Sequence, residues 1–145
     1  MKCLVLSYFD SKIGPKVIKT VGDEILREHL KEIIQYIDYH ENGYFIHEFR
    51  KIKSANMIFF VESPLARGTT EKVMISIVLI DEDTDPRTFS HLLEIFVKKF
   101  KQIKDVYKGF YLEEHNNSKG QEFLINIETL MHDIFNKFPL KSIVI

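Results

Sequence analysis

The sequence predicts an α+β domain in which a five-stranded antiparallel sheet lies between one helix on one face and two helices on the other. Three observations lead to this prediction: short apolar runs separated by turn residues, three segments with apolar residues at helical spacing, and two runs that are apolar at nearly every position. The predicted order is β-β-α-β-β-β-α-α. A chain of 145 residues with 45% hydrophobic content suits a single domain, residues 1–145, with one sizeable core.

The first two predicted strands form a hairpin. One apolar run ends at Phe9 and the next begins at Val17, with a polar stretch between them. The carboxylate of Asp10 can cap the turn, Gly14 can adopt a positive φ, and Pro15 fixes φ while offering no N–H. We therefore expect Phe9, Asp10, Gly14 and Pro15 to define the turn.

Apolar residues at steps of three and four predict an amphipathic helix after this hairpin. Asn42 and Gly43 supply its stop signal. The residues of its predicted buried stripe are Ile25, Leu26, Leu30, Ile33, Ile34 and Ile37.

Three strands follow this helix. Tyr44–Lys51 alternates between two sides, as a partly solvated strand does, whereas Asn56–Val61 and Val73–Ile80 are nearly continuous apolar runs. Runs of the second kind suit strands covered on both faces, so we place them at the centre of the sheet with Cys3–Phe9. Tyr44–Lys51 and the lysine-bearing Lys16–Thr20 then form the two edges.

Two further helices complete the predicted fold. Asp85 and Pro86 supply an N-cap and a first-turn residue, and Gly109 is a candidate terminator. The apolar positions of the second helix are Phe89, Leu92, Leu93, Phe96, Phe100, Ile103 and Tyr107. Those of the third helix, which is predicted to end before Pro139, are Phe123, Ile127, Leu130, Met131, Ile134 and Phe138. The tail, residues 139–145, is either a short extra strand or a docked extension.

Composition excludes several functional classes. Twenty basic and 21 acidic residues give a formal net charge of -1, which supplies no general attraction to nucleic acid. Cys3 is the only cysteine, so we expect no internal disulfide, no cysteine-based zinc site and a reducing, cytoplasmic setting. The longest apolar runs fall far short of the roughly 20 residues that cross a bilayer. We therefore expect no membrane insertion and no secretory signal, while peripheral association with a membrane stays possible.

No catalytic or cofactor motif is visible. The 6 histidines lie on different predicted elements without the spacing of metal ligands. The chain has neither of the two glycine-rich nucleotide-binding motifs, and no serine lies in a G-x-S-x-G context. We expect no metal, no cofactor and no enzymatic turnover by this chain alone.

The loop between the two central strands, residues 62–71, allows two interpretations. It is either an ordinary polar hairpin loop, or its Arg67 projects from a sharp turn and contacts an acidic partner or a phosphate, which match the planar guanidinium. The lysines within residues 98–104 allow a similar choice between a solvated helix face and a docking patch.

The motif F-D-x-x-x-G-P, formed by Phe9, Asp10, Gly14 and Pro15, resembles the first hairpin of longin domains. The similarity is greatest to those of the nitrogen permease regulator 2 and folliculin group and of archaeal longin-like proteins. The predicted order of elements is also similar to the longin fold. The resemblance implies a platform for small GTPases and membrane-traffic assemblies. It also implies homo- or heterodimers with a longin or roadblock partner, built on sheet edges and a flanking helix.

This resemblance directs attention to the outer strand. We expect Tyr44, Ile46, Glu48 and Arg50 to bind a partner together with the first helix, because an exposed strand invites pairing. In the nitrogen permease regulator 2 and folliculin group a loop arginine acts as an arginine finger, and Arg67 falls in the similar loop, which implies GTPase activation as an alternative. A small-ligand sensor of the PAS or profilin type is a further alternative, and it predicts an enclosed pocket between sheet and helices.

Overall fold

The computed structural model describes residues 1–65, 68–110 and 118–138. Its five strands form one antiparallel sheet in the spatial order β2-β1-β5-β4-β3. Their bounds are β1 Lys2–Asp10, β2 Gly14–Gly22, β3 Gly43–Phe49, β4 Ile52–Glu62 and β5 Thr70–Ile80. The predicted placement of three apolar strands at the centre and two charged strands at the edges is confirmed.

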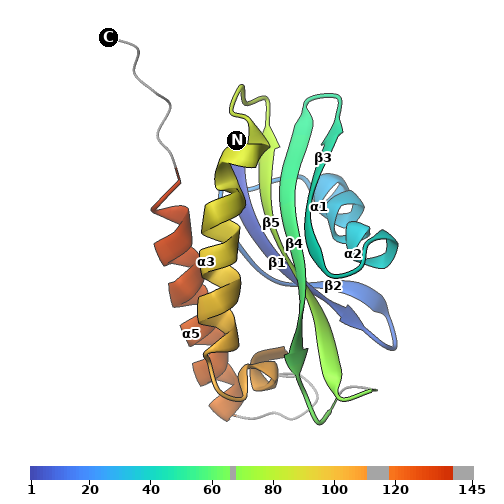
Figure 1. The fold of residues 1–145 in the computed structure, drawn as a ribbon, viewed down its shortest axis with the longest axis vertical. Helices are drawn as coiled ribbons and strands as arrows, with labels where there is room; N and C mark the ends of the chain where they lie inside the picture. The colour runs from blue at the N-terminus through green and yellow to red at the C-terminus, as the bar shows by residue number, and fades with distance from the viewer. Residues whose placement is uncertain (66–67, 111–117, 139–145) are drawn as a thin grey trace.

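Helices cover both faces of this sheet (Figure 1). One face carries α1 (Arg27–Ile34) and α2 (Tyr36–Tyr39), and the other carries α3 (Ser90–Lys101) and α5 (Ser118–Phe135). Two 3-10 turns, η1 (Pro86–Phe89) and η2 (Val106–Phe110), flank α3. The structure thus confirms the predicted α+β class and the predicted distribution of helices over the two faces.

The β1–β2 turn is organised by Asp10. Its carboxylate accepts hydrogen bonds from the backbone N–H groups of Lys12 and Ile13, at 2.8 and 3.2 Å. Burial by itself raises the pKa of Asp10, but these bonds, together with one from Tyr8, lower the pKa below its ordinary value. Gly14 closes the turn with φ +86° and pairs across the hairpin with Asp10.

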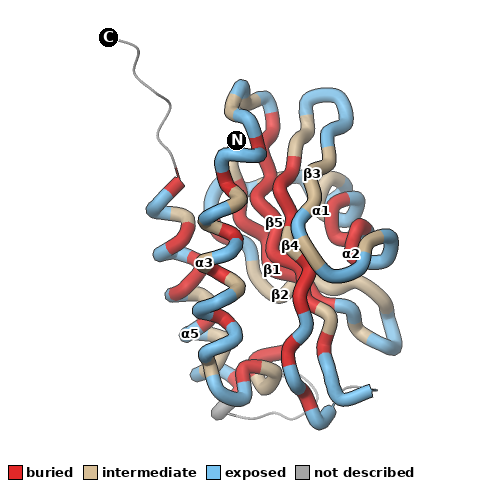
Figure 2. The backbone as a smooth tube through the Cα atoms, viewed as in Figure 1, coloured by how far each residue is buried: buried red, intermediate tan, exposed pale blue. Residues whose placement is uncertain are grey.

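Alternation along the strands builds a hydrophobic core on each face of the sheet. The larger core lies under α3 and α5, where Phe100 packs against Phe59 and Phe96 with ring centroids 5.4 and 5.5 Å apart. The smaller core lies under α1 and α2 and includes Cys3 and Ile37. Buried residues follow the central strands in Figure 2, while exposed residues mark the outer helix faces.

The predicted first helix differs from the observed one. The chain forms two short helices that meet at Gln35, and α1 begins only at Arg27. Leu26, which was predicted in the buried stripe, is 60% exposed. The reason is its extended backbone, with φ -60° and ψ 140°, which takes its side chain out of the helical periodicity.

The predicted second helix is too long. The helix α3 ends at Lys101, and Asp105 has φ +58°, which reverses the chain before η2. Ile103 and Tyr107 still pack against the larger core, although they lie outside α3. Gly109 does not terminate a helix. A Cβ there would lie 3.2 Å from Ile127, so Gly109 allows α5 to approach η2 closely. The tail, residues 139–145, lies outside the described residues.

Candidate functional site

The strand β3 is an open edge of the sheet. Within the described residues it pairs with β4 alone, from Gly43 opposite Ile58 to Phe49 opposite Ile52. Its side chains alternate, so Phe45 and His47 face α2, whereas Tyr44, opposite Met57, faces the side of the sheet that carries α3. Ile46 and Glu48 share the side of Tyr44.

The side of β3 that faces α2 is held by four ring systems and a lysine. The Tyr36 hydroxyl lies 2.9 Å from His47 Nδ1, and the two rings stack at 4.2 Å. The His40 ring stacks on Phe45 at 3.7 Å, and Lys72 Nζ donates to the His40 carbonyl at 2.7 Å. Burial raises the pKa of Tyr36 to about 12, so its hydroxyl remains protonated at neutral pH. These contacts hold the β3 backbone in place from the side of the sheet that carries α2.

The outer part of β3 displays aromatic and cationic side chains. Tyr44 is 37% exposed and Phe49 is 51% exposed. The Arg50 guanidinium lies 5.2 Å from the Phe49 ring centroid, a cation–π geometry. Arg50 was predicted within a strand that reached Lys51, but it occupies the β3–β4 turn with φ +57°. The strand ends earlier because Phe49 and Ile52 already pair across a two-residue turn.

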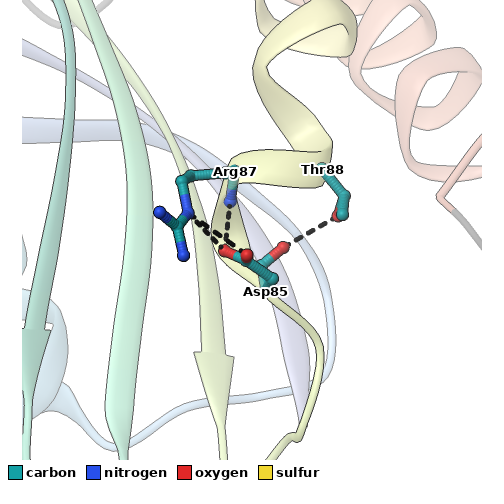
Figure 3. A network of polar contacts seen from close by, with 3 residues as sticks. All are labelled: Asp85, Arg87 and Thr88. Carbon is teal, nitrogen blue, oxygen red and sulfur yellow. Dashed lines mark hydrogen bonds and ion pairs between the residues drawn. The ribbon is translucent and has the colours of Figure 1, made fainter.

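Arg87 extends this surface and was not predicted from the sequence. Asp85 Oδ1 accepts from the Arg87 backbone N–H at 3.0 Å and from Arg87 Nε at 3.1 Å, and the Thr88 hydroxyl donates to the Asp85 carbonyl at 2.8 Å (Figure 3). The hydrogen bond from the Arg87 side chain is the main cause of the lowered pKa of Asp85. Asp85 thus caps η1, as its position before Pro86 predicted.

Arg87 also interacts electrostatically with Glu48 and Tyr44, so these three side chains lie near one another. Only the capping role of Asp85 was visible in the sequence. Nothing in the spacing from residue 44 to residue 87 indicates that Arg87 interacts electrostatically with β3, because that depends on where η1 packs on β4 and β5.

The structure separates two parts of the predicted interface. Tyr44, Ile46 and Glu48 lie on the side of the sheet that carries α3, whereas the first helix lies against the opposite side. These residues and that helix therefore do not form one continuous face. We define the β3 edge surface as Tyr44, Ile46, Glu48 and Arg87 on the α3 side, with Phe49, which alternation places on the α2 side, and Arg50 of the β3–β4 turn at the end of the strand.

Arg67 lies outside the described residues, so its predicted role is untested. The two residues that follow it have positive φ, at Gly68 (+85°) and Thr69 (+68°), so the chain does turn sharply there.

Other chemistry is limited in the part of the chain that the structure describes. It contains no group of three or more His, Cys, Asp or Glu residues arranged to hold a metal ion. Its helices are too short or too polar to span a membrane. Cys3 is buried, and this burial raises the pKa of its thiol to about 11, so the reactive thiolate is scarce at neutral pH.

Comparison with known proteins identifies the fold. No family model matches the sequence, and no curated protein matches it. Among solved structures, a longin domain of Lst4 from K. lactis is similar over 97% of this chain and 100% of that chain, with 16% sequence identity and a TM-score of 0.50. The chain therefore has the longin fold, as the hairpin motif implied.

Proposed function

We propose that this chain is a non-catalytic interaction module that binds a small GTPase or a membrane-traffic assembly. It acts as a dimer, either with a second copy of itself or with a longin or roadblock partner. The observation that carries the proposal is the open β3 edge, which exposes Tyr44 and Phe49 and has Arg87 of η1 nearby. Aromatic residues and arginine are the types most enriched at binding hot spots.

The backbone of β3 supplies the pairing surface. An edge strand presents unpaired N–H and C=O groups, and a strand from a partner can satisfy them. The contacts of Tyr36 and His40 behind β3 hold that edge in one conformation, which reduces the conformational entropy lost when a partner binds. Glu48, Arg50 and Arg87 then form a charged rim that selects the partner by complementary charge.

The small GTPase is the partner class that the longin resemblance implies, and the fold supports it. A platform of this kind needs a rigid surface and no reacting groups of its own. The stacked rings behind β3 and the buried thiol of Cys3 are consistent with that requirement.

A matched pair of variants tests the role of the edge. Tyr44→Glu places a charge on the β3 edge surface, and Tyr39→Glu makes the same change at a tyrosine of α2 that is 75% exposed. Sedimentation velocity at micromolar concentration should show a dimer for the wild-type chain and for Tyr39→Glu, and a monomer for Tyr44→Glu. A wild-type chain that forms neither a homodimer nor a heterodimer with a longin or roadblock partner from its own cell contradicts the dimer.

Binding to a small GTPase needs a separate measurement. Purified small GTPases from the same cell, loaded with GDP or with a non-hydrolysable GTP analogue, are presented to the immobilised chain by biolayer interferometry. We expect at least one to bind in a nucleotide-dependent way and to lose affinity with Tyr44→Glu. If none binds, the GTPase assignment is wrong. Comparing the GTP hydrolysis of a bound GTPase with wild type and with Arg67→Ala tests the arginine-finger alternative.

A further inference from the structure

The strand β4 extends beyond its neighbour β3. The β3–β4 pairing stops at Gly43 opposite Ile58, whereas β4 remains paired with β5 as far as Glu62 opposite Thr70. Among the described residues, 59–62 of β4 therefore have a neighbouring strand on one side only. Besides the edge strands β2 and β3, this leaves a further short stretch of open edge at the end of the sheet near η2 (Figure 1).

A groove of about 470 Å³ runs beside this stretch, between β4 and the segment that joins α3 to η2. Its apolar lining includes Phe60 and Val61 from β4, and Ile103 and Tyr107 from the opposite wall. Phe60 is 42% exposed. The groove thus combines unpaired strand backbone with exposed apolar surface.

Two lysines give this groove its charge. Lys101 and Lys104 line it near the end of α3, and neither belongs to an ion pair within the described part of the chain. Of the two acidic residues in the lining, Asp105 is paired with Lys108 at 3.8 Å, while Glu62 follows Val61 and so alternation places its carboxylate on the other side of β4, the side of Phe60. Among the described residues, the wall opposite β4 therefore offers two ammonium groups without an ion pair, of which Lys101 Nζ lies 5.9 Å from the Phe59 ring centroid.

We infer that this groove binds an extended acidic peptide, which adds to residues 59–62 of β4 as a further strand. Alternation fixes the character of the peptide. Every second side chain of the peptide would point to the α3 side of the sheet, toward Lys101 and Lys104, and should be a carboxylate. The alternate side chains of the peptide would lie on the side of Phe60 and should be apolar. The groove lies beyond Gly43, the first residue of β3, so it is separate from the β3 edge surface.

Fluorescence anisotropy with a defined probe tests this inference. The probe is a fluorescein-labelled peptide of sequence Gly-Val-Glu-Val-Glu-Val-Gly, and its matched control carries lysine in place of glutamate. We expect saturable binding of the acidic peptide to the full chain and at least about tenfold weaker binding of the basic one. Binding should also weaken as salt is raised, since the attraction is between partly exposed charges.

Two double variants locate the site. Lys101→Glu with Lys104→Glu reverses both charges of the groove, and Lys98→Glu with Lys99→Glu makes the same change on α3 at lysines that do not line it. We expect the first variant to lose at least about tenfold in affinity and the second to stay close to wild type. Amide NMR shifts of the wild-type protein on titration with the acidic peptide should be largest at residues 59–62.

Several results would overturn the inference. Equal affinity for the acidic and basic peptides would exclude charge recognition, and equal loss in both double variants would leave only a general attraction to α3. Amide shifts centred on β3 would show that the peptide binds the edge of β3 and not residues 59–62 of β4. Failure of this inference would leave the dimer test with Tyr44→Glu unaffected, because the two surfaces use different residues.

Discussion

Single positions in this fold are constrained by close approach as much as by burial. Gly22 ends β2 with φ +113°, and a Cβ there would lie 2.5 Å from Phe135 Cε2 and 2.6 Å from the Lys2 carbonyl oxygen. The end of α5 is thus seated directly on the last residue of an edge strand. Gly43 has a similar φ of +120°, but a Cβ there would meet nothing within 4 Å.

This contrast gives a matched prediction. Both Gly22→Ala and Gly43→Ala force an unfavourable positive φ, which costs about 1–3 kcal/mol. Only Gly22→Ala adds a clash with backbone and ring, so its free energy of unfolding should fall by about 1–3 kcal/mol more than that of Gly43→Ala. Urea unfolding followed by circular dichroism measures both values. Equal losses would show that α5 moves away from Gly22 without cost.

Buried polar side chains weaken the sheet face under α1 and α2. Asn56 Nδ2 donates to Ser54 Oγ at 2.9 Å, but Asn56 Oδ1 and the facing Ser76 Oγ have no hydrogen-bond partner in the structure. A buried polar group without a partner costs about 1–3 kcal/mol. This face therefore gains less from burial than the apolar runs of β4 and β5 suggest.

At the scale of elements, α1 and α2 are the less stable of the two sets of helices that cover the faces of the sheet. The helix α1 has 8 residues and α2 has 4, both too short to be stable alone. The residue at the N-cap position of α1 is Leu26, which offers no side-chain hydrogen bond to the first turn. The opposite cover includes α3 and α5, with 12 and 18 residues.

Restoring a cap should stabilise α1. Leu26→Ser and Leu26→Ala remove nearly the same apolar side chain, but only serine supplies an oxygen for the exposed N–H groups of the first turn. We expect Leu26→Ser to be more stable than Leu26→Ala by about 1 kcal/mol. Hydrogen exchange at residues 27–34 should slow by a corresponding factor. Identical stability would mean that the first turn is already satisfied by water.

The sequence predicted strands more accurately than helices. The runs around Ile58 and Ile77 lie between neighbours on both sides, and covering both faces requires apolar residues at nearly every position. Their short length and the turn residues that flank them favour strands over buried helices. Helix ends depend on local backbone angles instead. The extended Leu26 and the positive φ of Asp105 are set by how the chain packs on the sheet, and no periodicity contains that information.

At the scale of the whole molecule, the two cores share one set of strands. Neighbouring residues of β1, such as Cys3 and Leu4, point into different cores, and the same holds for Met74 and Ile75 of β5. Loss of one core therefore removes the support on which the other depends. Contacts of this kind make unfolding cooperative.

We accordingly expect one unfolding transition. Far-ultraviolet circular dichroism, which follows helices and strands, and near-ultraviolet signals from the buried tyrosines should give the same midpoint in urea. Ile37→Ala in the smaller core and Phe100→Ala in the larger one should both lower that midpoint for both signals. Separate midpoints would show that α1 and α2 detach before the sheet unfolds.

The fold and the interface differ in how much the sequence reveals. The hairpin motif of Asp10 and Gly14 implied the fold, because it is local and each residue has a defined role in the turn. The electrostatic interaction of Tyr44 with Arg87 was not predicted, since it depends on the register of β3 and on the position of η1, which lie far apart in the sequence. The order of strands in a sheet can be inferred from the pattern of apolar and charged residues. The residues of a helix that lie near a given strand cannot be inferred in this way.

The burial of Cys3 has a practical consequence for measuring this molecule. Its side chain is 1% exposed and its thiol pKa is about 11, so maleimide reagents at neutral pH will modify it far more slowly than an exposed cysteine. A cysteine introduced at the exposed residue 39 or 60 would then be the preferred site of attachment without removal of the native one. Distances between dyes on two copies could thus report how their edges meet.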